Sequence, residues 1–152
     1  MITASPPKSE INSAIALYSS GQIQAALDAI ETLTKSHPND PLLYNINGIC
    51  YKTIGKLDVA VKNFEKALAI KPNYAEVHYN LGVTFHELGQ PNAAVRSYEK
   101  ALAIKPDYAN ACNNLGVIFN ELNRNDAAVK SLERALAIKP DFADACNNLG
   151  IS

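Results

Sequence analysis

The hexapeptide ALAIKP occupies residues 67–72 and returns at residues 101–106 and 135–140, each time 34 residues further along the chain. A second string, Asn-Leu-Gly, recurs with the same period at residues 80–82, 114–116 and 148–150. A fixed period of this length is typical of arrays in which one small helical unit is repeated. The sequence therefore predicts an array rather than a chain with a single closed core.

The period divides the chain into four full blocks and part of a fifth. We expect residues 1–6 to be a flexible N-terminus. The blocks that follow are a degenerate first repeat at 7–40, full repeats at 41–74, 75–108 and 109–142, and the truncated first helix of a fifth repeat at 143–152. The fifth block stops before its partner helix, so we expect the chain to be an N-terminal piece of a longer protein.

Each block is predicted to be a pair of helices. In the third block Val77, Leu81 and Phe85 recur at helical spacing and form an apolar stripe. Gly89 is expected to end this helix in a left-handed conformation, and Pro91 to begin the second helix. A proline stops each second helix, and the next residue is expected to cap the helix that follows. These expected caps are Asn39, Asn73, Asp107 and Asp141.

A column of glycines is predicted to lie in the middle of the first helices. Glycine there costs roughly 1 kcal/mol relative to alanine, so the column needs a structural reason. We expect close helix crossing against a column of alanines in the second helices. The glycines are Gly48, Gly82, Gly116 and Gly150, and the alanines are Ala26, Ala60, Ala94 and Ala128.

These columns are where the chain resembles the tetratricopeptide repeat family. In the third block the family pattern is met by Leu81-Gly82, Phe85, Ala94, Tyr98, Ala101 and Pro106, with His78 in place of an aromatic residue. The resemblance implies an all-α, right-handed superhelical solenoid of antiparallel helix pairs. It also implies a concave wall lined by the first helix of each pair, and a role as an adaptor that binds peptides.

The candidate peptide-binding residues lie on the face of the first helices that is opposite the packing stripe. They include a column of asparagines whose amides could pair with a peptide backbone through both donor and acceptor. The alternative is that these amides bond neighbouring helices or water. The candidates are Asn45, Ile49, Glu76, Tyr79, Asn80, Val83, His86, Glu87, Asn110, Asn113, Asn114, Val117, Asn120, Glu121 and Asn148.

The charge of this face predicts which peptides it holds. A variant of the family binds the acidic C-terminal tails of chaperones through lysine, asparagine and arginine, but the matching columns here carry no cations. Chaperone tails are therefore not expected as partners. The acidic groups Glu76, Glu87 and Glu121 favour a neutral or basic extended peptide.

No catalytic or metal-binding pattern is found in the sequence. His78 and His86 are eight residues apart, and His86-Glu87 has no second histidine at the spacing of a zinc motif. Cys112 and Cys146 occupy equivalent positions in adjacent repeats, where helices pack about 8–10 Å apart, too far for a disulfide. We expect all three cysteines to be small core residues, with no metal, no cofactor and no enzymatic activity.

Composition narrows the partners and the compartment. The chain has 152 residues and a formal net charge of −1, which gives no basic surface for nucleic acid or an anionic membrane. The sequence shows no signal-peptide pattern and no long apolar run, and its three cysteines suit a reducing compartment. We therefore expect a cytoplasmic protein.

The leading functional hypothesis is a non-catalytic scaffold that holds an extended peptide. One alternative is that the chain is the partner- or substrate-recognition region of a longer glycosyltransferase or sulfotransferase. Another is a self-assembling structural scaffold, in which the truncated C-terminal helix pairs with another copy of the chain.

Overall fold

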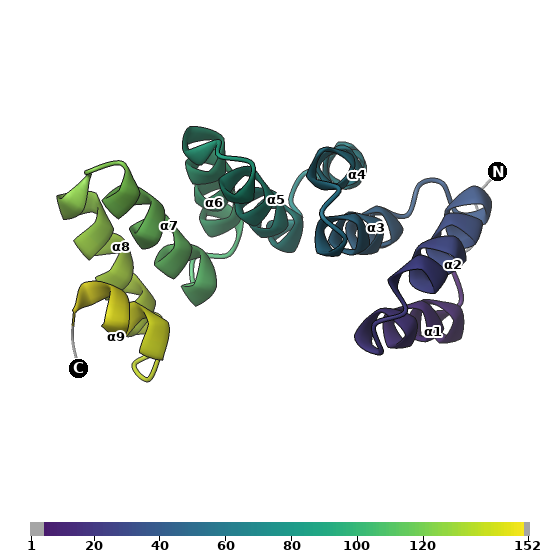
Figure 1. Cartoon of the computed structure of the whole chain (residues 1–152), viewed down its shortest axis with the longest axis horizontal. Helices are drawn as coiled ribbons and strands as arrows, with labels where there is room; N and C mark the ends of the chain where they lie inside the picture. The colour runs from purple at the N-terminus through teal and green to yellow at the C-terminus, as the bar shows by residue number, and fades with distance from the viewer. Residues whose placement is uncertain (1–4, 151–152) are drawn as a thin grey trace. The chain divides into compact units, whose positions relative to one another are not determined.

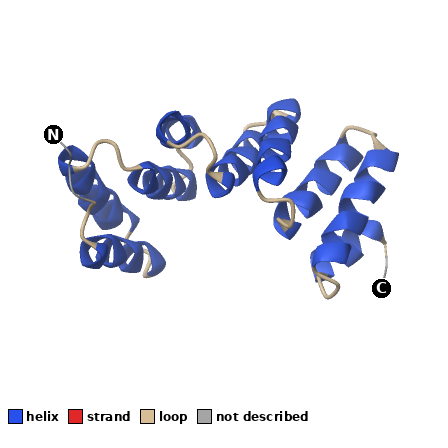
Figure 2. Cartoon of the chain, turned by 180° about the vertical axis from the view of Figure 1, so that it is seen from behind, coloured by secondary structure: helices blue, strands red, loops and turns tan. Residues whose placement is uncertain are grey.

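The computed structural model describes residues 5–150 of the chain. Residues 1–4, which make up most of the expected flexible N-terminus, and residues 151–152 lie outside the described range. Residues 5–150 form nine α-helices and no strand (Figures 1 and 2). The expected all-α repeat fold is confirmed.

The helices come in pairs separated by short turns. The first helices from the second pair onward begin at Pro41, Ala75, Ala109 and Ala143, at intervals of 34 residues. In chain order the helices are α1 Lys8–Ser19, α2 Ile23–Ser36, α3 Pro41–Thr53, α4 Leu57–Ile70, α5 Ala75–Glu87, α6 Pro91–Ile104, α7 Ala109–Glu121, α8 Asn125–Ile138 and α9 Ala143–Leu149.

The chain divides into two compact units, which are described separately. The N-terminal unit ends at Val77 and the C-terminal unit begins at His78. In the N-terminal unit α1 packs on α2, α2 on α3, and α3 on α4. In the C-terminal unit α6 packs on α7, α7 on α8, and α9 on both α7 and α8. Each unit has its own apolar core, with Ile30 and Leu43 fully buried in the first and Ile118 in the second.

The tight turns inside the pairs have the conformation that the sequence predicts. Gly21, Gly55 and Gly89 have φ of +84°, +80° and +73°, and Asn123 takes this position in the fourth pair with φ of +60°. At the end of α5 the backbone N–H of Gln90 donates to the carbonyl of Phe85 at 2.9 Å. This bond closes the helix over a left-handed residue, where glycine or asparagine is the least strained choice.

The mid-helix glycines do mark close helix crossings, but the atoms they approach are not the expected alanine column. A Cβ on Gly48 would lie 2.4 Å from the ring of Phe64, and one on Gly82 would lie 2.7 Å from the ring of Tyr98. On Gly116 it would lie 2.5 Å from the side chain of Leu132, with the Ala128 carbonyl oxygen at 3.3 Å. Each glycine therefore makes room for the large side chain sixteen residues later.

Gly150 departs from this pattern, and its expected mid-helix position is wrong. The last described helix, α9, ends at Leu149, and Gly150 is its C-cap with φ of +78°. A Cβ built on Gly150 would meet nothing within 4 Å. With no helix crossing there, the glycine can take the left-handed conformation that ends a helix.

The expected caps after the prolines are also wrong. The cap of α3 is Asp40, one residue later than predicted, and its carboxylate accepts from the backbone N–H of Leu42 at 2.9 Å. Tyr108 and Phe142 occupy the same place before α7 and α9, and neither side chain caps the helix. The helices begin one residue later than predicted, so aspartates 107 and 141 lie outside the capping position.

An aromatic residue at this position serves another purpose in three of the four junctions. The ammonium of Lys71 lies 4.5 Å from the centre of the Tyr74 ring, that of Lys105 4.7 Å from Tyr108, and that of Lys139 5.1 Å from Phe142. A lysine at the C-terminal end of a helix also interacts favourably with the helix dipole. Each lysine therefore ties the end of one helix to the start of the next.

Candidate functional site

The predicted site residues lie on the first helix of each pair and differ widely in exposure. In the C-terminal unit, Asn113 is buried. Six are half-buried (Tyr79, Asn80, Val83, His86, Asn114 and Val117), and five are exposed (Glu87, Asn110, Asn120, Glu121 and Asn148). In the N-terminal unit Asn45 is buried, Ile49 is half-buried and Glu76 is exposed. The exposed members alone can meet a partner without rearrangement.

Asn114, at the centre of the asparagine column, is bonded to its own unit. Its Nδ2 donates to the hydroxyl of Tyr79 at 3.3 Å and to that of Tyr98 at 3.2 Å. An amide has two N–H groups, so these two bonds use both of its donors. The amide therefore links α5, α6 and α7, which is the alternative role left open for the asparagines.

Asn148 continues this arrangement on the last described helix. Its Nδ2 donates to the Oδ1 of Asn113 at 2.9 Å, which joins α9 to α7. The partner, Asn113, is 6% exposed and is therefore not available to a guest peptide. Asn45 is likewise 3% exposed, and it hydrogen-bonds the Tyr74 side chain within the N-terminal unit.

Three tyrosines surround Asn114 and form a cluster that sequence reasoning recognised only at Tyr79. The rings of Tyr79 and Tyr108 are stacked with centres 4.9 Å apart, and Tyr79 also contacts Tyr98 at 5.7 Å. Burial raises the pKa of Tyr98 strongly, against the opposing effect of its hydrogen bond from Asn114. Burial likewise raises the pKa of Tyr79. Both hydroxyls therefore stay neutral and act as acceptors for the amide.

The signal for this cluster is visible in the sequence. The position of Tyr98 is filled by Phe64 in the second repeat and by Leu132 in the fourth. A tyrosine in this core column brings a hydroxyl that usually needs a hydrogen-bond partner when buried. Asn114, sixteen residues later, supplies that partner.

At the C-terminal ends of the same helices, His86 and Glu121 form a second link between α5 and α7. The Nε2 of His86 lies 2.8 Å from the Oε2 of Glu121. The two side chains are 34% and 51% exposed, so water and a partner can reach both. This is the most accessible part of the predicted site where two candidate residues meet.

Charge is divided between the two kinds of helix in the C-terminal unit. Neither lysine nor arginine occurs on α5, α7 or α9, whereas these helices carry Glu87, Glu121 and Asp144. The basic residues of the unit lie on α6, α8 and the segments that flank them: Arg96, Lys100, Lys105, Arg124, Lys130, Arg134 and Lys139. The first helices therefore offer acidic and amide groups to a partner.

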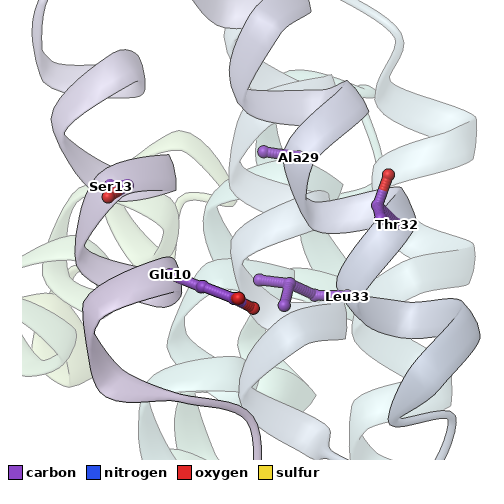
Figure 3. Close-up of a pocket in the computed structure, with 5 residues that line it drawn as sticks. All are labelled: Glu10, Ser13, Ala29, Thr32 and Leu33. Atoms are coloured by element: carbon purple, nitrogen blue, oxygen red, sulfur yellow. The ribbon is translucent and has the colours of Figure 1, made fainter.

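The described part of the chain also contains surface hollows. One, of about 280 Å³, lies between α1 and α3 and is lined by Ile15, Tyr18, Ser19, Ile46, Ile49 and Cys50. A second, of about 330 Å³, lies between α1 and α2, where Glu10 extends toward Leu33 (Figure 3). A third, of about 360 Å³, lies between α6, α7 and α8 and has Glu99 and Arg134 in its lining.

Residues 5–150 contain no group of three histidine, cysteine, aspartate or glutamate side chains arranged to hold a metal ion. All three cysteines are free thiols; Cys50 and Cys112 are buried and Cys146 is half-buried. Burial raises the pKa of the Cys50 and Cys112 thiols, so neither is an activated nucleophile. No helix in the described range is both long enough and apolar enough to span a bilayer.

Two models of one sequence family match the chain. The first, described as TPR repeat, covers residues 48–89 and 118–152, and the second, described as tetratricopeptide repeat, covers residues 75–108. A comparison with curated proteins found no match.

Several solved structures share the fold. The crystal structure of MamA is 26% identical over 90% of this chain and 80% of that one, with a TM-score of 0.83. MamA 41-end from Desulfovibrio magneticus RS-1 is 22% identical over 98% of this chain and 84% of that one, with a TM-score of 0.86. The first TPR of Spaghetti, bound to an HSP90 peptide, is 24% identical over 73% of this chain and 88% of that one, with a TM-score of 0.71.

Proposed function

The chain belongs to the tetratricopeptide repeat family, and we propose that it is a non-catalytic scaffold whose first helices hold an extended peptide of a partner protein. The observation that carries the proposal is the division of charge in the C-terminal unit. The helices α5, α7 and α9 carry acidic side chains and no lysine or arginine. A neutral or basic peptide is complementary to this face, and an acidic one is repelled by it.

The contacts of such a peptide are assigned to the exposed residues rather than to the buried amides. Asn110 and Asn120 on α7 and Asn148 on α9 can donate to and accept from a peptide backbone. Glu121 can pair with a basic side chain of the guest. The inner amides, Asn113 and Asn114, hold the helices on which these exposed groups stand.

A neighbour with a bound peptide supports the general mode of binding. The TPR domain of Spaghetti is bound to the HSP90 peptide SRMEEVD, which contains three acidic residues. In the present chain the first helices of the C-terminal unit lack the cations that such a peptide needs. The proposed guest is therefore neutral to basic, and acidic chaperone tails are not proposed as partners. Because its three cysteines are free, we place the protein in a reducing compartment, the cytoplasm.

The test is binding of labelled extended peptides to the whole chain, followed by fluorescence anisotropy. A pool of twelve-residue peptides graded from acidic to basic is compared at low and at physiological salt. We expect affinity to rise from acidic to basic peptides, and the difference to shrink as salt screens the charges. Failure of every peptide to bind, or tightest binding by the acidic peptides, would overturn the proposal.

A pair of matched variants places the interaction on the first helices. Glu121→Gln removes a carboxylate from α7 but keeps an acceptor for His86, and is expected to weaken a basic peptide by up to about fivefold. Glu133→Gln makes the same change at an exposed position of α8 and should leave affinity unchanged. Equal losses in the two variants would show a general charge effect instead of a binding face.

A further inference from the structure

The asparagine column is interrupted at Ile46, and the structure shows a hollow at that point. Asn80, Asn114 and Asn148 fill this column in the later repeats, whereas the second repeat has an isoleucine. Ile46 lines the hollow of about 280 Å³ between α1 and α3. The exception in the sequence and the hollow in the structure therefore coincide.

The lining of this hollow is apolar and uncharged. Ile15 and Tyr18 from α1 face Ile46 and Ile49 from α3, and the buried Cys50 completes the lining on α3. Apolar cavities of about 150 Å³ already admit a molecule as large as benzene. The volume here is therefore sufficient for one large side chain of a guest, and the lining offers no partner for a charged one.

The walls of the hollow are fixed by the packing around them. The hydroxyl of Tyr18 is 3.0 Å from the Oγ1 of Thr53, which ties α1 to α3 at the edge of the hollow. Ile46 is 8% exposed and Cys50 is fully buried, so both are held in the core of the unit. Ile15, by contrast, is 41% exposed and is open to a partner.

The corresponding place in the C-terminal unit has different chemistry. Asn114 stands where Ile46 stands, and it is bonded to Tyr79 and Tyr98. His86 and Glu121, linked at 2.8 Å, occupy the columns of Tyr18 and Thr53. The apolar lining is therefore particular to the first two repeats and does not follow from the repeat pattern itself.

We propose that the hollow between α1 and α3 is an anchor site for a large aliphatic or aromatic side chain of the bound peptide. This inference rests on the proposed function and adds to it a specific requirement. The guest carries one large apolar residue, which Ile15, Ile46 and Ile49 surround. The acidic and amide face of the C-terminal unit selects charge, and the hollow selects side-chain size.

The first experiment uses a probe that does not depend on knowing the peptide. N-acetyl-leucinamide is titrated into the whole chain carrying ¹³C-labelled isoleucine methyl groups, and methyl shifts are followed by NMR. We expect saturable shifts at Ile15, Ile46 and Ile49, and none at the exposed Ile70 or Ile104. N-acetyl-lysinamide should leave all five methyl groups unshifted. Absence of saturable shifts at the three lining isoleucines would overturn the anchor site.

Matched variants then test the site within a peptide. Ile15→Asn changes an exposed lining residue, and Ile70→Asn makes the same change at a residue of similar exposure on α4. Ile15→Asn should weaken N-acetyl-leucinamide by about tenfold, and Ile70→Asn should not. Ile46→Asn restores the amide of the column and should also abolish binding, with circular dichroism used to check that the variant is folded.

The two proposals fail in different ways. If peptides bind the chain but replacing their large apolar residue by alanine changes affinity less than twofold, the anchor site is wrong and the scaffold stands. If N-acetyl-leucinamide binds at the three isoleucines but no peptide does, the hollow is a small-molecule site and the peptide scaffold is wrong.

Discussion

The amide nitrogen of Asn148 lies 2.9 Å from the amide oxygen of Asn113, so that α9 is tied to α7 by side chains 35 residues apart. The same separation joins Tyr18 to Thr53 in the N-terminal unit. It also joins His86 to Glu121 and Tyr79 to Asn114 in the C-terminal unit. Polar bonds between successive first helices thus follow one register, of one repeat plus one residue.

The first prediction concerns the docking of α9. Asn148→Ala removes the donor and leaves the buried oxygen of Asn113 without it, which should cost about 1–3 kcal/mol. Because α9 is a short terminal helix, we expect the loss to appear as faster amide hydrogen exchange in α9 and little change in the N-terminal unit. Asn147→Ala, a change at the exposed neighbouring residue, is the control and should leave exchange in α9 nearly unchanged.

The second prediction concerns the crossing of α3 and α4. Gly48→Ala gains helix propensity, but its Cβ would meet the Phe64 ring at 2.4 Å, and the overpacking should cost about 1–3 kcal/mol of folding free energy. The first repeat carries Ala14 and Ile30 in the same two columns, both fully buried. The double variant Gly48→Ala with Phe64→Ile should therefore be more stable than the sum of the two single changes predicts. Additive losses in chemical denaturation would contradict this account.

Much of the fold could be predicted from the sequence, because helix ends and turns are set by local chemistry. Gly89 and Asn123 were expected in left-handed turns, and both have positive φ. The partner of Gly82 could not be predicted, because the side chain that approaches it belongs to another helix. The helix starts were predicted one residue early, so the role of Tyr108 beside Lys105 was missed.

The candidate site could be predicted less completely than the fold. Helical spacing identified the face, but it did not show that Asn114 bonds to Tyr98 or that Asn113 is 6% exposed. Those facts depend on three helices meeting, and one helix at a time does not reveal them. The break at Ile46 was visible in the sequence, but the hollow beside it required coordinates.

The third prediction concerns a polar pair in the core of the second repeat. Asn47 stands where later repeats have leucine, and its buried Oδ1 has no hydrogen-bond partner. Its Nδ2 donates to the Oδ1 of Asn63 at 3.4 Å, which is a long bond. Asn47→Leu with Asn63→Ser reproduces the residues of the third and fourth repeats. We expect the double variant to be about 1–2 kcal/mol more stable. A lower denaturation midpoint would show that the pair stabilises the repeat.

The last prediction concerns alkaline pH and the tyrosines around Asn114. Burial raises the pKa of Tyr98 and Tyr79 in the folded chain, whereas an unfolded tyrosine titrates near about pH 10. Below that pH both states are protonated and the stabilising contribution is complete. Above it the unfolded chain loses protons that the folded chain retains, so stability falls as pH rises toward the folded pKa.

Tyr98→Phe separates this effect from the other groups that titrate in the same range. The buried Cys50 and Cys112 thiols, whose pKa is also raised, contribute equally to the original chain and to the variant. At pH 7 the variant should be about 0.5–1.5 kcal/mol less stable, because Asn114 loses one acceptor. Between pH 10 and 11.5 its stability should fall less steeply than that of the original chain, measured by urea denaturation. Parallel slopes would mean that the Tyr98 hydroxyl ionises as readily in the folded chain as in the unfolded one.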